Sequence, residues 1–179
     1  MKATGIVRRI DDLGRVVIPK EIRRTMRIRE GDPLEIYTDH EGEVIFKKYS
    51  PIGELASFAT QYAETLYKAG ELSVVITDRD SVIAASGVPK KEFLDKRLTS
   101  SLEKKIEDRK LYTYADRDAA IAVTEQSEGY SVRCMMPILA EGDIIGAVCS
   151  LGSSPATPNE TEVKLVRTAA TFLGKQLES

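Results

Sequence analysis

The sequence predicts an α+β protein in two parts, a small β-rich unit at the amino end and a larger antiparallel sheet flanked by helices. Three observations support this prediction. Short β-branched segments separated by turn residues fill the first fifty positions, two helical segments with matching apolar spacing bracket the remainder, and strand pairs lie between those helices. The boundary falls at a Ser-Pro pair, which gives domains over residues 1–50 and 51–179.

Length and composition limit the class of protein. A chain of 179 residues holds one ordinary domain or two small ones, and its 42% hydrophobic and 30% charged residues suit a soluble globular fold. No apolar run nears the roughly 18 residues that span a bilayer, and the start MKATGIVRRI lacks the apolar centre of a signal peptide. We therefore expect a cytoplasmic protein without membrane contacts. Two cysteines and a single histidine predict neither a metal nor a cofactor nor a disulfide framework.

The net charge of −2 hides an asymmetry along the chain. Residues 1–29 hold nine basic and three acidic side chains, a net charge of +6, whereas residues 30–48 hold two basic and six acidic ones, a net charge of −4. Residues 51–179 hold fifteen basic and nineteen acidic side chains, again −4. Positive charge gathered at one end is typical of a module that binds a polyanion.

The first fifty residues predict the order β-β-α-β-β. TGIVRRI and GRVVIP form two strands around the turn DDLG, Pro19 opens the short helix PKEIRRTMRI at its first position, and PLEIYTD pairs with EVIFKKY across HEG. So small a unit buries too little surface to be stable alone, and neither a disulfide nor a metal supports it. We therefore expect an obligate homodimer with interleaved strands.

The helix of this unit separates apolar from basic side chains. At 100° per residue Ile22 and Met26 share one side, which we assign to a dimer core, and the basic residues of the helix take the other. The planar guanidinium fork of arginine suits phosphate oxygens and guanine edges, so double-stranded DNA is the expected partner. The alternative is a solvated helix face balanced by acidic neighbours, although the acidic residues lie mainly in the next hairpin.

Residues 1–50 resemble the swapped-hairpin AbrB-type DNA-binding domain of transition-state regulators from endospore-forming bacteria, above all at GRVVIPKEIRR. The resemblance implies a β-barrel-like, swapped-hairpin dimer whose arginines contact DNA, and the matching positions are Arg8, Arg15, Arg23 and Arg24. The charge pattern adds Lys2, Arg9, Lys20 and Arg27. The resemblance further implies a nucleoid-associated regulator of the developing spore that activates and represses genes and reads DNA shape as well as base edges.

Two helices bracket the second part. One follows Ser50 as N-cap and Pro51 as first residue, and the other follows a capping box of Thr157, Pro158 and Glu160. Each carries an apolar seam spaced by three and four, and these seams are our candidate oligomerisation residues: Ile52, Leu55, Tyr62 and Leu66 in the first, and Val163, Val166, Leu173 and Leu177 in the second. The seams pack either within one chain or between chains, and the second alternative gives a homotetramer.

Strands and one long helix are expected between them. ELSVVITDRDSVIAASG predicts a hairpin, PKKEFLDKRLTSSLEKKIEDRK one helix, and LYTYA and AIAV short strands. GYSVRCMMPILAEGDIIGAVCSLG predicts a hairpin turning at Glu141-Gly142, with Leu139 opposite Ile144 and Cys134 opposite Cys149. Both faces of this hairpin are apolar, so both are covered. We interpret the cysteines as core residues, with a redox switch as the alternative.

An antiparallel sheet between terminal helices resembles a GAF-type sensor fold. Such domains often bind a small molecule beside the sheet, so a small-molecule ligand is implied without its identity or its pocket residues. The signature of the cyclic-nucleotide-binding branch is missing from this sequence, and the domain could instead serve only assembly.

A catalytic constellation is not found, so we expect a protein that is not an enzyme. His40 lies in the predicted turn TDHEGE, and the glycines form no phosphate-binding motif. The favoured function is a DNA-binding transcription regulator with an attached sensor or assembly domain. The rival is an antitoxin-like protein-interaction module, which shares the N-terminal fold but usually continues into a short flexible tail rather than into a long patterned chain.

Overall fold

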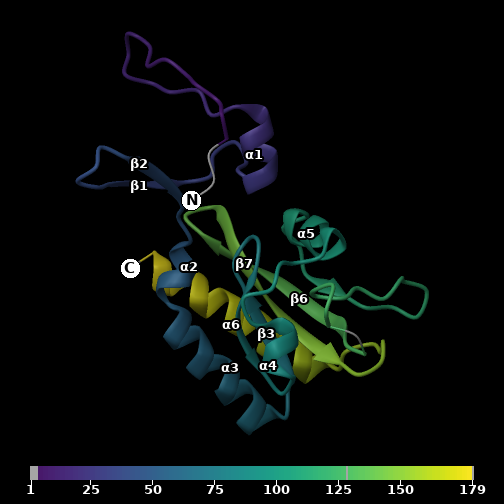
Figure 1. Cartoon of the computed structure of the whole chain (residues 1–179). Helices are drawn as coiled ribbons and strands as arrows, with labels where there is room; N and C mark the ends of the chain where they lie inside the picture. Colours follow the sequence, from purple (N-terminus) through teal and green to yellow (C-terminus); the bar gives the residue numbers. More distant parts are fainter. Residues whose placement is uncertain (1–3, 128, 179) are drawn as a thin grey trace. The chain divides into compact units, whose positions relative to one another are not determined.

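A computed structural model describes residues 4–127 and 129–178 of the chain. The chain divides into two compact units, Met1–Tyr49 and Ser50–Ser179. We call them the N-terminal and the C-terminal unit, and describe each by itself (Figure 1).

The N-terminal unit contains a helix and a hairpin. Helix α1 spans Lys20–Met26, and strands β1, Leu34–Thr38, and β2, Val44–Lys48, pair antiparallel, which confirms the predicted second hairpin. Pro19 is the N-cap of α1, with ψ 148°, rather than its first residue. The fixed φ of proline is compatible with both the N-cap and the first helical position. The ψ of Pro19 is extended rather than helical, so the helix begins one residue later, at Lys20.

The two strands predicted around DDLG are absent from residues 4–18 of the single chain. The turn itself is present: the Asp11 carboxylate accepts hydrogen bonds from the backbone N–H groups of Leu13 and Arg15. The flanking segments are unpaired, and Val7 is 85% exposed. One chain therefore makes no closed barrel from its described strands, since the first hairpin lacks a neighbouring edge to complete its hydrogen bonds.

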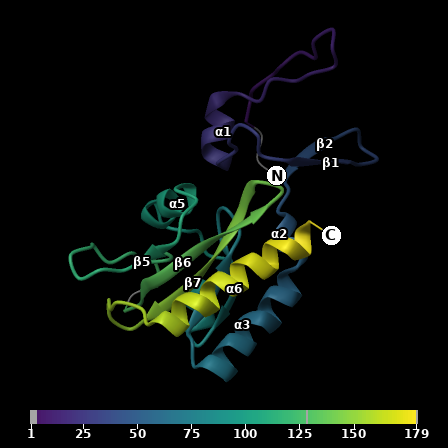
Figure 2. The same cartoon turned by 180° about the vertical axis from the view of Figure 1, so that it is seen from behind.

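The C-terminal unit is a five-stranded antiparallel sheet with helices on both faces, in the strand order β4-β3-β7-β6-β5. Its strands are β3 Val74–Thr77, β4 Val82–Ser86, β5 Tyr112–Thr113, β6 Ser131–Ala140 and β7 Asp143–Gly152. Its helices are α2 Pro51–Glu54, α3 Ala56–Gly70, α4 Lys90–Phe93, α5 Ser100–Glu107 and α6 Glu160–Leu177. Figure 2 shows α3 and α6 side by side over one face of the sheet.

Both faces of the sheet are covered, as the apolar pattern predicts. On the α3–α6 side, Ile76, Ile138 and Val148 pack in one core with residues of those helices. On the opposite side, Val75 and Met135 lie in a second core with residues of α4 and α5. Strand residues that are apolar on both faces are thereby removed from water on both faces.

Two of the predicted helices are each divided into two. The segment 51–70 divides at Leu55, and the predicted helix over 89–110 becomes α4 and α5. Between α4 and α5 the backbone turns through Asp95, with φ 59°, and the Leu98 N–H donates to the Asp80 carbonyl. The predicted strand AIAV makes isolated backbone bonds instead of a strand, such as Thr99 N–H to the Val123 carbonyl.

The N-cap of α6 is also corrected. Asn159 caps this helix, because its side-chain oxygen accepts from the Glu162 N–H at 2.8 Å. The predicted capping box that begins at Thr157 is therefore wrong by two positions. At the other bracketing helix the prediction is confirmed, since Ser50 caps α2 by accepting from the Gly53 N–H.

The β6–β7 hairpin confirms the predicted turn and corrects the pairing of the cysteines. Leu139 pairs with Ile144 as expected, but a register shift between Ile138 and Leu139 places Cys134 opposite Ser150 and Met135 opposite Cys149. Cys134 lies in the α3–α6 core and Cys149 in the other core, and both are free thiols. The two thiols are thus on opposite faces of the sheet, which disfavours the alternative of a redox pair.

Candidate nucleic-acid interface

Seven of the eight predicted DNA contacts lie within the described residues of the N-terminal unit, and Lys2 lies outside them. Six of the seven have exposed side chains: Arg8, Arg9, Arg15, Lys20, Arg23 and Arg24. Arg27 is partly buried and ends α1. Helix α1 brings Lys20, Arg23 and Arg24 within two turns, so three of these cations form one ridge. The opposite side of this helix carries Ile22, partly buried, and Met26, 55% exposed.

Arg15 is fixed at the first turn by an acidic neighbour. Its guanidinium contacts the Asp11 carboxylate at 2.8 Å, with the Arg15 side chain still 70% exposed. The backbone N–H of Arg15, and next its guanidinium, hold the pKa of the Asp11 carboxyl below its ordinary value. The sequence did not single out Asp11, although an aspartate that opens a turn is a common local acceptor.

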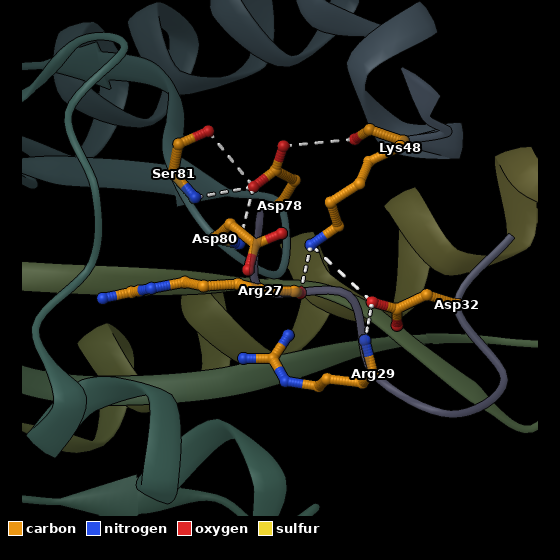
Figure 3. Close-up of polar contacts among 8 residues, drawn as sticks. Arg27, Arg29, Asp32, Lys48, Asp78, Asp80 and Ser81 are labelled. Carbon is orange, nitrogen blue, oxygen red and sulfur yellow. Dashed lines mark hydrogen bonds and ion pairs between the residues drawn. The ribbon is translucent and has the colours of Figure 1, made fainter. Parts of the chain in front are cut away.

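The C-terminal end of α1 is held by side chains from the rest of the same unit (Figure 3). Lys48 on β2 donates to the carbonyl of Arg27 at 3.0 Å, and its ammonium lies 3.7 Å from the Asp32 carboxylate. That carboxylate accepts from the Arg29 N–H at 2.8 Å. Neither Asp32 nor Lys48 was predicted as a functional residue, because Lys48 reaches the Arg27 carbonyl across 21 positions and such a distant contact leaves no local signal in the sequence.

Half of the candidate oligomerisation residues are already used inside one chain. Ile52, Leu66, Val166 and Leu173 are buried in the α3–α6 core. The other four, Leu55, Tyr62, Val163 and Leu177, are partly exposed. Only these four keep surface for a partner chain.

Three aromatic rings cluster on the outer side of α3 and α6. The ring centroids of Tyr62 and Phe172 are 5.6 Å apart, and those of Phe58 and Phe172 are 5.9 Å apart. Phe172 remains 38% exposed, and partial burial raises the pKa of Tyr62. Phe58 and Phe172 lie beside the predicted seam rather than on it, so the spacing rule alone did not select them.

A half-open recess of about 340 Å³ is lined by Lys105, Asp108, Lys110, Leu111 and Tyr112. Within the described ranges, no three His, Cys, Asp or Glu side chains group as a metal site. No helix there has the length and apolarity that a membrane crossing requires. His40 lies exposed in the β1–β2 turn, as predicted.

Comparisons with known proteins confirm both predicted folds. A profile described as "Stage V sporulation protein T C-terminal, transcription factor" matches residues 54–178, and one described as "Antidote-toxin recognition MazE, bacterial antitoxin" matches residues 7–53. Stage V sporulation protein T of Bacillus subtilis (strain 168) is 54% identical over 178 residues, 99% of each chain. The transition state regulatory protein AbrB of the same organism is 65% identical over 51 residues, which are 28% of this chain and 52% of AbrB.

Among solved structures, the GAF domain of an Acinetobacter phosphoenolpyruvate-protein phosphotransferase covers 69% of this chain and 81% of its own, with a TM-score of 0.57 and 14% sequence identity. At this identity the likeness shows the fold alone. The C-terminal unit therefore has a GAF fold.

Proposed function

This chain belongs to the stage V sporulation protein T family of transcription factors, and we propose that it binds double-stranded DNA as a homodimer through the arginines of its N-terminal unit. In this way it activates some sporulation genes and represses others. We place it in the cytoplasm of the developing spore, associated with the nucleoid, and propose no enzymatic activity.

One observation supports the proposal most directly: exposed arginines occupy a unit that has no core of its own. Among the described residues of the N-terminal unit only Pro19 is buried, whereas Val7, Ile10 and Val17 are each at least 69% exposed. A second copy would cover this apolar surface and double the cationic groups by two-fold symmetry. Arg8, Arg15, Arg23 and Arg24 then contact phosphates and base edges, with Lys2, Arg9, Lys20 and Arg27 beside them.

Charge reversal on α1 tests this proposal. Arg23→Glu places a carboxylate against DNA phosphates, so we expect binding to a fluorescein-labelled duplex, enriched by the wild-type chain from a random pool, to be lost. Arg117→Glu is the matched control, because Arg117 is also exposed but lies in the C-terminal unit. Fluorescence anisotropy measures the affinity and circular dichroism the fold. Wild-type affinity in Arg23→Glu would remove Arg23 from the interface.

The dependence of affinity on salt is a second test. Each neutralised phosphate releases counterion, and the logarithm of the binding constant falls by about 0.9 per phosphate for each unit in log salt. A dimer with several arginines per chain should therefore lose affinity steeply as salt rises. An affinity independent of salt would contradict phosphate contact.

For the C-terminal unit we propose assembly of two dimers into a homotetramer through the aromatic cluster of Phe58, Tyr62 and Phe172, extended by Leu55, Val163 and Leu177. Phe172 is exposed, and Phe58 and Tyr62 are partly exposed, so the three rings offer an apolar surface that a second copy would cover. Phe172→Asp should halve the mass measured by light scattering. Leu111→Asp is the matched control, since Leu111 is 37% exposed against 38% for Phe172. A tetramer in both variants would exclude this patch.

The GAF fold supports ligand sensing as a further role of this unit, with a small molecule that shifts DNA affinity by binding two states unequally. The antitoxin alternative rests on the profile match over residues 7–53. The folded unit that follows, in place of a flexible tail, favours the regulator. Co-purification of a toxin with the full chain would reverse this preference.

A further inference from the structure

We propose that Asp32 and Lys48 are positioning residues for DNA recognition, which hold the C-terminal end of α1 so that Arg23 and Arg24 are presented in a fixed orientation. The inference rests on the proposed DNA-binding function and adds to it. Neither residue needs to contact DNA. Both act through the backbone that follows the two arginines.

Helix α1 ends in an unusual backbone conformation. Arg27 adopts the left-handed conformation, with φ 52° and ψ 40°, which side chains with a Cβ disfavour and which glycine usually supplies at this position. Its N–H donates to the carbonyls of Arg23 and Arg24, and the Ile28 N–H donates to the Arg23 carbonyl at 2.8 Å. The backbone of the two arginines is therefore tied directly to the strained turn.

Two charged side chains, Lys48 and Asp32, stabilise that turn. The Lys48 ammonium donates to the Arg27 carbonyl, where a positive charge also favours the C-terminal end of a helix. The Asp32 carboxylate, 3% exposed, pairs with Lys48 and accepts from the Arg29 N–H. Figure 3 shows these three contacts meeting at the turn. Removing one partner of an ion pair that lies largely out of water is destabilising, so the two residues act together.

The contacts of Lys48 distinguish a role in positioning α1 from direct binding of a DNA phosphate. Lys48 would count as a phosphate ligand by charge alone, yet its ammonium points to the Arg27 carbonyl and its side chain is 25% exposed. Its neighbour Lys47 is exposed, and its ammonium lies 5.2 Å from the centroid of the Tyr37 ring. Substituting either lysine therefore removes the same charge from the same strand, but only the substitution of Lys48 also removes the contact to the end of α1.

The experiment compares Lys48→Met with Lys47→Met in the full chain, with the wild-type-enriched duplex as the probe and anisotropy titrations at several salt concentrations. Misplaced arginines lose bidentate contacts, so Lys48→Met should bind roughly 10–100-fold more weakly. The slope of log affinity against log salt should remain at least as steep as in Lys47→Met, because no phosphate ligand is removed. Lys48→Arg should restore affinity, since a guanidinium can also donate to the Arg27 carbonyl and pair with Asp32.

Two results would overturn the inference: equal affinities of Lys48→Met and Lys47→Met, or a slope reduced in Lys48→Met as much as in Arg24→Ala, which would make Lys48 a phosphate ligand. If Lys48→Met does not fold, Asp32→Asn decides. Its amide oxygen can still accept from the Arg29 N–H while the charge partner of Lys48 is lost, so weaker binding at an unchanged slope supports positioning and wild-type affinity refutes it. Failure of the wild-type chain to enrich any duplex would refute the proposed function instead.

Discussion

The two units contrast in where their apolar side chains go. The C-terminal unit covers both faces of its sheet, with Val75, Ile76 and Val148 at 0% exposure. The N-terminal unit leaves its β-branched residues in solvent, and even Val16 in the GRVVIP segment is 45% exposed. The same strand-forming composition thus produces a finished core in one unit and an unfinished surface in the other. The difference indicates that the N-terminal unit depends on a second chain for stability and that the C-terminal core does not.

Gly146→Val tests the completeness of the C-terminal core and should have the largest effect. A Cβ at Gly146 would overlap the backbone carbonyl oxygen of Thr77, so β3 and β7 could not stay paired. A loss of about 4 kcal/mol or more of unfolding free energy follows from such an overlap with backbone.

The two cysteines are the readout for this variant, because the sequence places both in the C-terminal unit. Cys134 and Cys149 are buried, and burial raises the pKa of Cys134 to about 12, so a thiol reagent should be slow on the folded unit. We expect rapid reaction in Gly146→Val. Gly70→Ala is the control, since the tightest contact of its Cβ would be with the flexible end of Leu165 rather than with backbone. Wild-type thiol protection in Gly146→Val would contradict the close packing at this position.

The same truncation in both units tests the contrast itself. Val75→Ala removes two methyl groups from a core, at a cost of roughly 2 kcal/mol. In the strand that GRVVIP would form in the proposed dimer, Val16 alternates with Arg15, so its side chain would lie on the face opposite to Arg15. If a partner chain covers Val16, Val16→Ala should lower the unfolding free energy by a similar amount. If the chain stays single, the same substitution should leave the unfolding free energy almost unchanged.

Urea unfolding at two protein concentrations separates these cases. The midpoint of the N-terminal transition should rise with protein concentration and fall in Val16→Ala, whereas Val75→Ala should lower the midpoint of the C-terminal transition at both concentrations. A Val16→Ala protein as stable as the wild type at both concentrations would leave the exposed apolar surface without a partner.

Local patterns in the sequence were sufficient for much of the fold. Alternating apolar residues around short turns predicted the β1–β2, β3–β4 and β6–β7 hairpins, and continuous apolar strands predicted a sheet covered on both faces. The distribution of charge along the chain located the cationic segment. These features depend on residues close together in sequence, where periodicity and turn chemistry act directly.

Features that depend on distant contacts were not predictable. The break between α4 and α5 follows from a bond between Leu98 and the carbonyl of Asp80, and the cysteine register follows from a bulge near Ile138. The Asp32–Lys48 pair joins two charged residues that read locally as ordinary surface groups. The strands predicted around DDLG are absent for the same reason. In our proposal, the strand edge with which they pair belongs to a second chain.

Ser50→Ala should have a smaller effect, at the point where the C-terminal unit begins. The Ser50 hydroxyl accepts from the Gly53 N–H at 3.2 Å and donates to the Asp78 carboxylate at 3.3 Å. Loss of an N-cap costs about 1 kcal/mol. The midpoint of the C-terminal transition in urea should fall accordingly, with Asn159→Ala, which removes the N-cap of α6, as the comparison. A change confined to the N-terminal transition would contradict a capping role.

Asp11→Asn should have the smallest effect, and it concerns the first turn of the N-terminal unit. The variant keeps an acceptor for the Leu13 and Arg15 N–H groups but no longer holds the Arg15 guanidinium by charge. Because exposed ion pairs are weak, DNA affinity should tighten by only about twofold. Asp12→Asn is the matched control, and equal tightening there would indicate a general charge effect.

The pH dependence of the wild-type turn follows from the same contacts. The folded pKa of Asp11 is lowered, so the turn is stabilised at pH values above the unfolded pKa, and this contribution disappears as the pH falls through the folded value. A carboxyl-detected NMR titration should show Asp11 titrating below the ordinary value of an aspartate. In Arg15→Ala the Asp11 pKa should rise towards its ordinary value, yet only partly, because the largest cause is the backbone N–H of residue 15, which alanine retains. Full recovery of the ordinary pKa in Arg15→Ala would show instead that the guanidinium dominates, and that Arg15 must break a stronger contact before it can bind phosphate.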